Sequence, residues 1–408
     1  MNLRRSIRFA ALPLVASLMA LTSASAAVVR FNVALDAAQE TPVSTSSATG
    51  TAIVLYDTEA NTLDLTVSLA NLANTVSNSH IHEGAPGVSG PPVVPLGDET
   101  NYARNGTTVT GTLTGLTYGG TPATLLSGGA YLNFHSAEFP SGEIRGQLVP
   151  EPVRFSAILS GAQEVPAAET QAYGAAQAVY DPETNMITTL VFVYNFTNTL
   201  ANSHIHEAPE GENGSVRVGF GGAAEYENSG MTYAQVFADR AYGGTPLLLL
   251  NDGAYVNVHS DVFPGGEIRG QLRAGDAGAR SRLINVSARG QVGTGDGALI
   301  AGFVIQGMEP LAVLATGRGP VLAQLGVSGV LENPILAVHD ASGRVLVVND
   351  DFGTGLLQAQ VTGSGFAPTE AAEAAAFLLL PPGAYTSVMG GVGETTGVGL
   401  VEAYEVAW

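Results

Sequence analysis

The sequence predicts an all-β protein made of tandem antiparallel β-sandwich or barrel domains, three in total. Short segments alternate apolar and polar residues, Gly- and Pro-rich loops separate them, and no long segment shows the 3.6-residue period of a helix. Many short strands with regular turn signals are typical of antiparallel sandwiches and barrels.

The first 26 residues differ from the rest. Arg4, Arg5 and Arg8 precede an apolar run over 9–21, and Ala24-Ser25-Ala26 matches an A-x-A cleavage site. These three parts in this order predict a secretory signal peptide over residues 1–26. We therefore expect a secreted, periplasmic or cell-surface protein with no transmembrane segment after cleavage.

The next part of the chain contains a long repeat. His80 and His204 are 124 positions apart, as are Glu143 and Glu267, so the two copies differ by no net insertion. A repeat of this length indicates two whole domains, which we place at residues 27–150 and 151–273. Within each copy a hairpin is predicted, over 51–56 and 62–68 in the first and over 175–180 and 187–194 in the second.

A small-residue linker over 273–279 precedes a third domain at residues 280–408, which lacks the repeated motifs. Its alternating segments predict strands, whereas the Ala- and Glu-rich stretch 369–380 predicts one short helix. The predicted strands are 299–305, 311–315, 335–339, 345–348, 385–389 and 399–406.

Composition excludes several classes of function. The chain has no cysteine, so disulfides and thiol nucleophiles are absent. The formal net charge of −20 argues against nucleic-acid binding, which needs clustered Lys and Arg, and suits divalent cations or basic partners. No nucleophile elbow, H-E-x-x-H motif or phosphate-binding loop occurs, and we nominate no catalytic residue.

Histidines form the main candidate site. In a strand, residues i and i+2 share a face, so each His-x-His segment presents two imidazoles side by side, a pair that suits zinc or copper. A third histidine follows at a fixed distance in each copy and completes a three-His set if its strand lies adjacent. The candidate metal ligands are His80, His82, His135, His204, His206 and His259.

A structural interpretation competes with metal binding. Glu83 and Glu207 follow the His-x-His segments as possible ligands or acceptors for an imidazole N–H, whereas the Gly-Glu-Ile-Arg-Gly-Gln segments supply further charges. A polar network that supports the fold is the alternative, with an ion pair between the Glu and the Arg of each such segment. The residues of that network are Glu83, Glu143, Arg145, Glu207, Glu267 and Arg269.

The segments HIHEGAPGVSGP and YLNFHSAEFPSGEIRGQL resemble the CHRD (chordin-type) domain, over about 28–150 and 151–273. The resemblance implies an extracellular β module of poorly defined biochemistry. The His-x-His-Glu segment is also similar to one in copper/zinc superoxide dismutase, although the match is short. Residues 280–408 resemble pre-peptidase C-terminal-type β-sandwich modules. There Asp340, Asn349, Asp350 and Asp351 offer oxygen ligands for Ca²⁺, but we interpret these segments as hairpin turns and His339 as structural.

Two functions follow as hypotheses. The first is an exported, non-enzymatic binding or structural protein whose partner is an extracellular protein, glycan or matrix. The second is a copper- or zinc-binding protein, either dismutase-like or a metal carrier, that uses the three-His set of each repeat. The distance of His135 from His80 and His82 discriminates between them.

Overall fold

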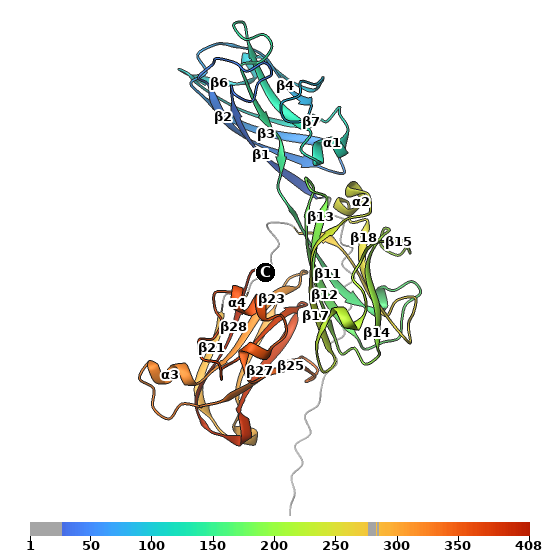
Figure 1. Ribbon diagram of the computed structural model, residues 1–408, viewed down its shortest axis with the longest axis vertical. Coiled ribbons are helices and arrows are strands. Elements are labelled where there is room, and N and C mark those ends of the chain that lie inside the picture. The colour runs from blue at the N-terminus through green and yellow to red at the C-terminus, as the bar shows by residue number, and fades with distance from the viewer. Residues whose placement is uncertain (1–26, 276–282, 284) are drawn as a thin grey trace, which may run out of the picture.

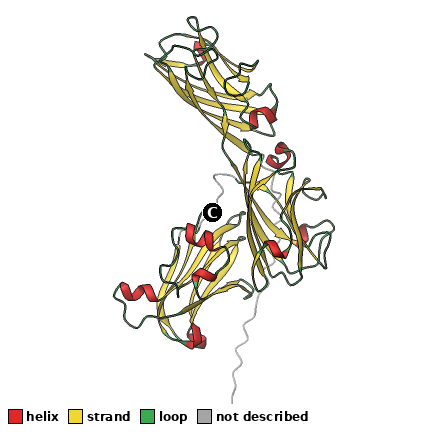
Figure 2. Cartoon of the chain, in the orientation of Figure 1, coloured by secondary structure: helices red, strands yellow, loops and turns green. Residues whose placement is uncertain are grey.

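The protein is an assembly of three β-rich lobes that follow one another along the chain (Figure 1). The structure is a computed structural model that describes residues 27–275, 283 and 285–408. The predicted signal peptide and most of the predicted linker lie outside the described residues. Figure 2 shows that strands make up each lobe and that the helices are short and peripheral, so the predicted all-β class is confirmed. No helix in the described part is long and apolar enough to cross a membrane.

The first lobe is one curled, ten-stranded antiparallel sheet with the strand order β5-β4-β8-β9-β1-β2-β3-β7-β6, and β10 pairs with β1. In β3, buried Leu63, Leu65 and Val67 alternate with outward-facing polar residues, so one face of the sheet lines a core. The predicted hairpin is confirmed as β2 and β3, which pair along their full length. The strands are β1 (Val28–Asp36), β2 (Thr49–Asp57), β3 (Thr62–Ala70), β4 (Val76–Glu83), β5 (Pro92–Gly97), β6 (Ala103–Asn105), β7 (Thr108–Thr117), β8 (Ala130–Ser136), β9 (Ile144–Gln147) and β10 (Val149–Pro150).

The second lobe repeats this topology strand for strand, in the order β15-β14-β18-β19-β11-β12-β13-β17-β16, with β20 paired to β11. The repeat in the sequence therefore corresponds to a repeated sheet, and its hairpin is β12 and β13. The strands are β11 (Val153–Ser160), β12 (Tyr173–Asp181), β13 (Met186–Tyr194), β14 (Leu200–Glu207), β15 (Ser215–Gly219), β16 (Glu227–Ser229), β17 (Thr232–Ala241), β18 (Ala254–Ser260), β19 (Ile268–Gln271) and β20 (Arg273–Ala274).

The third lobe is a sandwich of two four-stranded sheets, with the orders β21-β28-β23-β26 and β22-β27-β24-β25. Each of the six strands predicted for this region is present, and a further strand precedes them. The strands are β21 (Asn285–Val292), β22 (Leu299–Ile305), β23 (Leu311–Arg318), β24 (Pro334–Asp340), β25 (Val345–Asn349), β26 (Ala374–Leu380), β27 (Gly383–Gly391) and β28 (Gly397–Glu405).

Short helices and 3₁₀ turns connect the strands. The α-helices are α1 (Pro122–Leu126), α2 (Pro246–Leu250), α3 (Pro320–Gln324) and α4 (Gln358–Gly363). The 3₁₀ turns are η1 (Glu99–Asn101), η2 (Gly161–Gln163), η3 (Ala223–Glu225), η4 (Gly295–Gly297), η5 (Phe352–Thr354) and η6 (Val392–Glu394).

The helix predicted over 369–380 is wrong. Residues 374–380 form strand β26, and every one of them is buried. This strand lies at the edge of its sheet and contacts β12 and β13 of the second lobe, so both of its faces are covered. A strand covered on both faces carries a continuous apolar run instead of an alternating one, which explains why alternation missed it.

The second and third lobes share one hydrophobic cluster, because the outer face of the second sheet is apolar. Leu190 and Phe192 are fully buried against the third lobe, whereas the equivalent residues of the first repeat, Thr66 and Ser68, are exposed. Hydrogen bonds cross the same interface, for example from the Tyr194 hydroxyl to a main-chain carbonyl of β26 at 2.9 Å. The repeats thus share a fold but differ in what covers their outer face.

Candidate metal centre

The candidate site of the first repeat lies on the outer face of strands β4, β8 and β9. His80 and His82 project from one face of β4, while Ile81 between them points into the core and is fully buried. Across the strand pair His82 stands opposite Tyr131, and His135 lies four residues further along β8, opposite Asn78. The register of β4 and β8 therefore brings His135 to the other two histidines, which meets the condition that its strand lie adjacent to theirs.

Three imidazoles converge in each repeat. One nitrogen from each of His80, His82 and His135 lies within 4.8 Å of the other two. The ring centroids are 5.3 Å apart for His80 and His82, 5.5 Å for His80 and His135, and 6.0 Å for His82 and His135.

The main chain fixes which nitrogens face the centre. His82 Nδ1 lies 2.9 Å from the Gly90 carbonyl oxygen, and His135 Nδ1 lies 3.2 Å from that of Pro140. A carbonyl oxygen only accepts, so each Nδ1 carries the proton and each Nε2 keeps its lone pair. These two Nε2 atoms and His80 Nδ1 are buried without a hydrogen-bond partner. An orientation set by a carbonyl bond on the far nitrogen is the usual arrangement around metal-ligating histidines.

The second repeat reproduces this geometry. His206 Nδ1 lies 2.9 Å from the Gly214 carbonyl oxygen, and His259 Nδ1 lies 3.1 Å from that of Pro264. One nitrogen of each of the three rings again lies within 4.8 Å of the others. The atoms equivalent to those of the first repeat, His204 Nδ1, His206 Nε2 and His259 Nε2, are buried without a partner. The site is thus present twice in one chain.

Burial keeps these imidazoles neutral. Desolvation is the largest cause that lowers the pKa of His80, and its neighbours His82 and His135 lower it further. The same causes lower the pKa of His204 to about 4. The pKa of each of the other four histidines is lowered as well, again chiefly by burial. Neutral imidazole is the form that binds metals, so the site needs no proton loss at neutral pH.

Tyr131 and Arg145 hold the most buried histidine from the side. The Tyr131 ring stacks on the His82 imidazole, with centroids 4.9 Å apart and planes 11° apart. The guanidinium carbon of Arg145 lies 3.4 Å from the centre of the Tyr131 ring. This arrangement is a cation–π contact that is closed to solvent, because Arg145 is only 2% exposed.

Arg145 also anchors the loop over residues 84–91, which follows the His-x-His segment. Its guanidinium donates to the carbonyl oxygens of Val88 at 3.0 Å and Ala85 at 2.9 Å. Gly90 belongs to this loop, and a Cβ there would lie 1.5 Å from the Glu83 carbonyl oxygen. Only glycine therefore lets the loop pass close enough for its carbonyl to reach His82.

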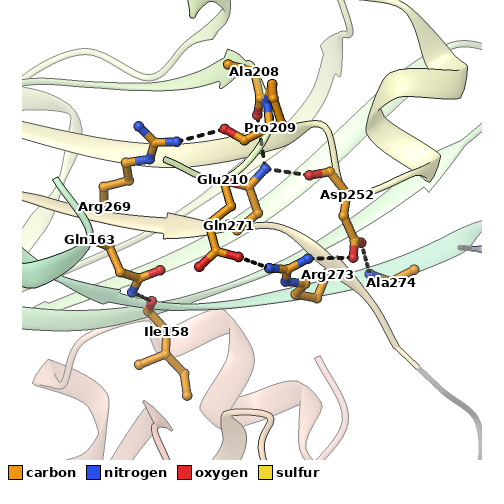
Figure 3. A network of polar contacts seen from close by, with 10 residues as sticks. All are labelled: Ile158, Gln163, Ala208, Pro209, Glu210, Asp252, Arg269, Gln271, Arg273 and Ala274. Carbon is orange, nitrogen blue, oxygen red and sulfur yellow. Dashed lines mark hydrogen bonds and ion pairs between the residues drawn. The ribbon is translucent and has the colours of Figure 1, made fainter. Parts of the chain in front are cut away.

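Figure 3 shows the corresponding network of the second repeat. Arg269 donates to the Pro209 carbonyl oxygen at 3.3 Å, and the Gln271 amide donates to that of Ala208 at 3.0 Å. Arg273 next to them pairs with Asp252 at 2.8 Å and with Glu210. In the first repeat the Gln147 amide donates to the Gly84 carbonyl oxygen at 2.9 Å. The loop after β14 is therefore held by the same Arg and Gln positions, although its own sequence has changed.

Glu83 and Glu207, predicted as possible metal ligands or as acceptors for an imidazole N–H, contact other groups. Glu83 accepts hydrogen bonds from the Tyr118 hydroxyl at 3.0 Å and from the Thr121 N–H, so it is not an acceptor for the histidines. Glu207 keeps the equivalent contacts and adds an ion pair with Arg217 at 2.9 Å. These carboxylates belong to a structural network.

The predicted ion pair within each Gly-Glu-Ile-Arg segment is wrong for the described residues. Glu143 accepts hydrogen bonds from Ser46 at 2.8 Å and from Asn74 at 3.2 Å, while Arg145 is turned toward the loop carbonyls. Glu267 has the equivalent partners Thr170 and Asn198. The reason is that other segments offer these groups nearer partners, which spacing along one strand does not show.

Glu40 and Glu164 are buried acids for which the sequence predicted no role. Glu40 is 4% exposed, and its carboxylate lies where a side chain on Gly142 would have to be. Burial raises the pKa of Glu40 to about 7, and the charge of Arg145 opposes this rise. Burial raises the pKa of Glu164 to about 7 in the same way, opposed by Arg269. The segment Gln-Glu-x-Pro occurs in both repeats, over 39–42 and 163–166, and is the sequence signal that could have indicated these residues.

Oxygen-rich segments of the third lobe form turns. Gly343 has a φ of +82° and donates to the Asp340 carbonyl oxygen at 2.9 Å, which closes the predicted hairpin between β24 and β25. Asn349 bonds to the Asp351 carbonyl oxygen at 2.9 Å within the next turn. Among the described residues, the groups able to hold a metal ion are the two three-His sets.

Comparison with known proteins supports the repeat. The CHRD domain matches residues 31–148 and 155–272, which together make up more than half of the chain. No curated protein matches the chain. Both matched segments contain a complete three-His set and the Arg and Gln that anchor its loop. The chain therefore belongs to the CHRD domain family and carries two CHRD domains in tandem.

Proposed function

We propose that this protein binds transition-metal ions, one copper or zinc ion in the three-His set of each CHRD domain. The observation that carries the proposal is that in both domains three imidazoles each bring one nitrogen within 4.8 Å of the others, and each ring has a buried nitrogen without a hydrogen-bond partner. The two domains have diverged elsewhere, so the same unpaired arrangement in each one speaks against an accident of packing.

A purely structural role does not account for these nitrogens. Burying a polar atom without a partner costs about 1–3 kcal/mol, and networks kept for stability normally satisfy their members. Here the Nδ1 atoms of His82 and His135 are satisfied by main-chain carbonyls, whereas the Nε2 atoms of both rings are buried without a partner. A bound cation supplies the missing partner for all three rings at once.

The chemistry of the donors favours copper or zinc. Imidazole nitrogen suits both ions, and the set includes no carboxylate of the kind that calcium or magnesium requires. Zinc–nitrogen bonds of about 2.0–2.1 Å require nitrogens roughly 3.3–3.6 Å apart. Nitrogens that lie within 4.8 Å of one another therefore have to approach by at most about 1.5 Å. The net charge of −20 raises the local concentration of cations.

We further propose that the protein works outside the cytoplasm as a non-enzymatic binding or carrier protein. The pattern of residues 1–26 supports export. A copper or zinc carrier needs metal ligands but no catalytic residues, and the sequence nominates none. Its partner in this role is an extracellular protein, glycan or matrix component.

Metal stoichiometry tests the proposal. Untagged full-length protein, stripped and dialysed against Zn²⁺ or Cu²⁺, is compared with a His80→Ala/His82→Ala variant, a His204→Ala/His206→Ala variant and the combination of both. We expect two tightly bound ions per chain in the parent, one in each double variant and none in the combined variant. His339→Ala is the matched control, because this histidine lies outside both sets.

Circular dichroism and thermal unfolding establish that each variant is folded. An unchanged stoichiometry in the folded combined variant, or no tight binding by the parent, contradicts the proposal and leaves the histidines as part of the scaffold.

A further inference from the structure

We propose that each metal ion keeps one coordination position open to a small, exchangeable anion such as hydroxide, azide or cyanide. This inference rests on the proposed metal binding, and it adds a ligand site that the histidines alone do not define. It distinguishes a reactive centre from one that only stiffens the domain.

The number of protein ligands leaves one coordination position free. Each set offers three donor atoms, and no fourth His, Asp or Glu of the described residues joins either group. Structural zinc sites are closed by four protein ligands, whereas sites with three protein ligands take water or substrate at the fourth position. The count therefore corresponds to an open site.

The nearby carboxylates are held away from the histidines by other contacts. Glu83 accepts from Tyr118 and Thr121, and Glu143 accepts from Ser46 and Asn74. The Glu40 carboxylate lies against Gly142. For one of these acids to reach the ion, it would have to abandon hydrogen bonds or move through packed backbone.

The charge of the bound ion favours an anion as the fourth ligand. Three neutral imidazoles leave the charge of a divalent ion uncompensated, and an uncompensated charge in a partly buried site is costly. Arg145 lies close enough to His82 to act on it electrostatically and adds positive charge to the same side. An anion at the fourth position offsets this charge, while a neutral ligand does not.

The partial exposure of two histidines in each site gives an anion a path from solvent to the ion. His82 is buried, but His80 and His135 are both partly exposed, and Asn78 opposite His135 is exposed. The second repeat has the same order, with His204 and His259 partly exposed and Asn202 exposed. The donor nitrogens are themselves buried, so an anion reaches the ion by passing between these two partly exposed rings.

Anion titration of the metal-loaded protein tests the inference. Full-length protein is loaded with two equivalents of Cu²⁺ or, in parallel, of Co²⁺ as a spectroscopic substitute for zinc, and azide is added. We expect an azide-to-copper charge-transfer band, and a change in the Co²⁺ visible bands, that saturate at two azides per chain. The His80→Ala/His82→Ala variant is expected to show half of this signal.

The outcomes separate the inference from the proposal on which it rests. Stoichiometric metal binding with spectra that azide leaves unchanged means that the coordination sphere is closed, which overturns the inference but not the proposed function. No metal binding overturns both. A band that persists at full intensity in the folded variant lacking His80, His82, His204 and His206 places the anion at a different ion and also overturns the inference.

Discussion

The guanidinium carbon of Arg145 lies 3.4 Å from the centre of the Tyr131 ring, and that of Arg269 lies 3.5 Å from the centre of the Tyr255 ring. Each tyrosine in turn stacks on the most buried histidine of its site. The contact links the two motifs that characterise each repeat, since the arginine belongs to the Gly-Glu-Ile-Arg-Gly-Gln segment and the histidine to His-Ile-His-Glu. It also explains why both motifs survive while the loops between them change.

Arg145→Lys tests this link. A lysine ammonium cannot cover the Tyr131 ring as a plane and bond to the carbonyls of Val88 and Ala85 together, so the loop that positions His82 is released. We expect metal affinity at the first site to fall by about tenfold or more, as for other residues that orient metal ligands. Competition with a chelator measures the two sites, and the second site serves as internal control. Equal affinities in parent and variant contradict the prediction.

Gly90→Ala tests the loop itself. A Cβ at Gly90 would meet the Glu83 carbonyl oxygen at 1.5 Å, so the loop must move and withdraw its own carbonyl from His82. We expect weaker metal binding at the first site and a lower melting temperature. Gly219→Ala is the control, because a Cβ there meets no atom within 4 Å. If both variants bind metal like the parent, the carbonyl of Gly90 does not orient the histidine.

Phe192→Asp tests the interface between the second and third lobes. Phe192 is fully buried against Phe377, with ring centroids 6.2 Å apart, so the change buries a charge and removes a large apolar contact. We expect a loss of about 3–5 kcal/mol in the free energy of unfolding. The equivalent change in the first repeat, Ser68→Asp, lies on an exposed face and is expected to alter stability by about 0.5 kcal/mol or less. Urea unfolding measures both, and similar losses in the two variants contradict this account.

Glu40→Gln tests the buried acid. The folded pKa of Glu40 is about 7, above its usual value of 4.5, so the folded state holds a proton that the unfolded state has released. Its contribution to stability is full below about pH 4.5 and is lost as the pH rises through 7. Glutamine stays neutral, so we expect the variant to gain on the parent by about 3 kcal/mol between about pH 4.5 and pH 8. The metal-free forms are compared, because the histidines then contribute equally to both.

A constant difference between the Glu40→Gln variant and the parent across this pH range contradicts the prediction. It would mean that the charge of Arg145 keeps Glu40 ionised in the folded state.

Much of the architecture follows from local patterns. Alternation placed β2 and β3, because the outer face of the first sheet lies in water, and the sequence repeat then placed their counterparts β12 and β13. The same rule failed at β26, whose two faces are both covered. The predicted ion pair between Glu143 and Arg145 was also wrong. Glu143 instead accepts hydrogen bonds from Ser46 and Asn74, which are distant in sequence.

The sequence by itself determined the all-β class, the two repeats and the side-by-side placement of His80 and His82, since each depends on spacing along a single segment. Only the tertiary structure decided that His135 meets them and that Tyr131 and Arg145 brace the site. It also decided that the third lobe covers the second repeat and not the first. These features depend on strand order and register, and a strand's neighbour is chosen by the burial of whole faces rather than by its own residues.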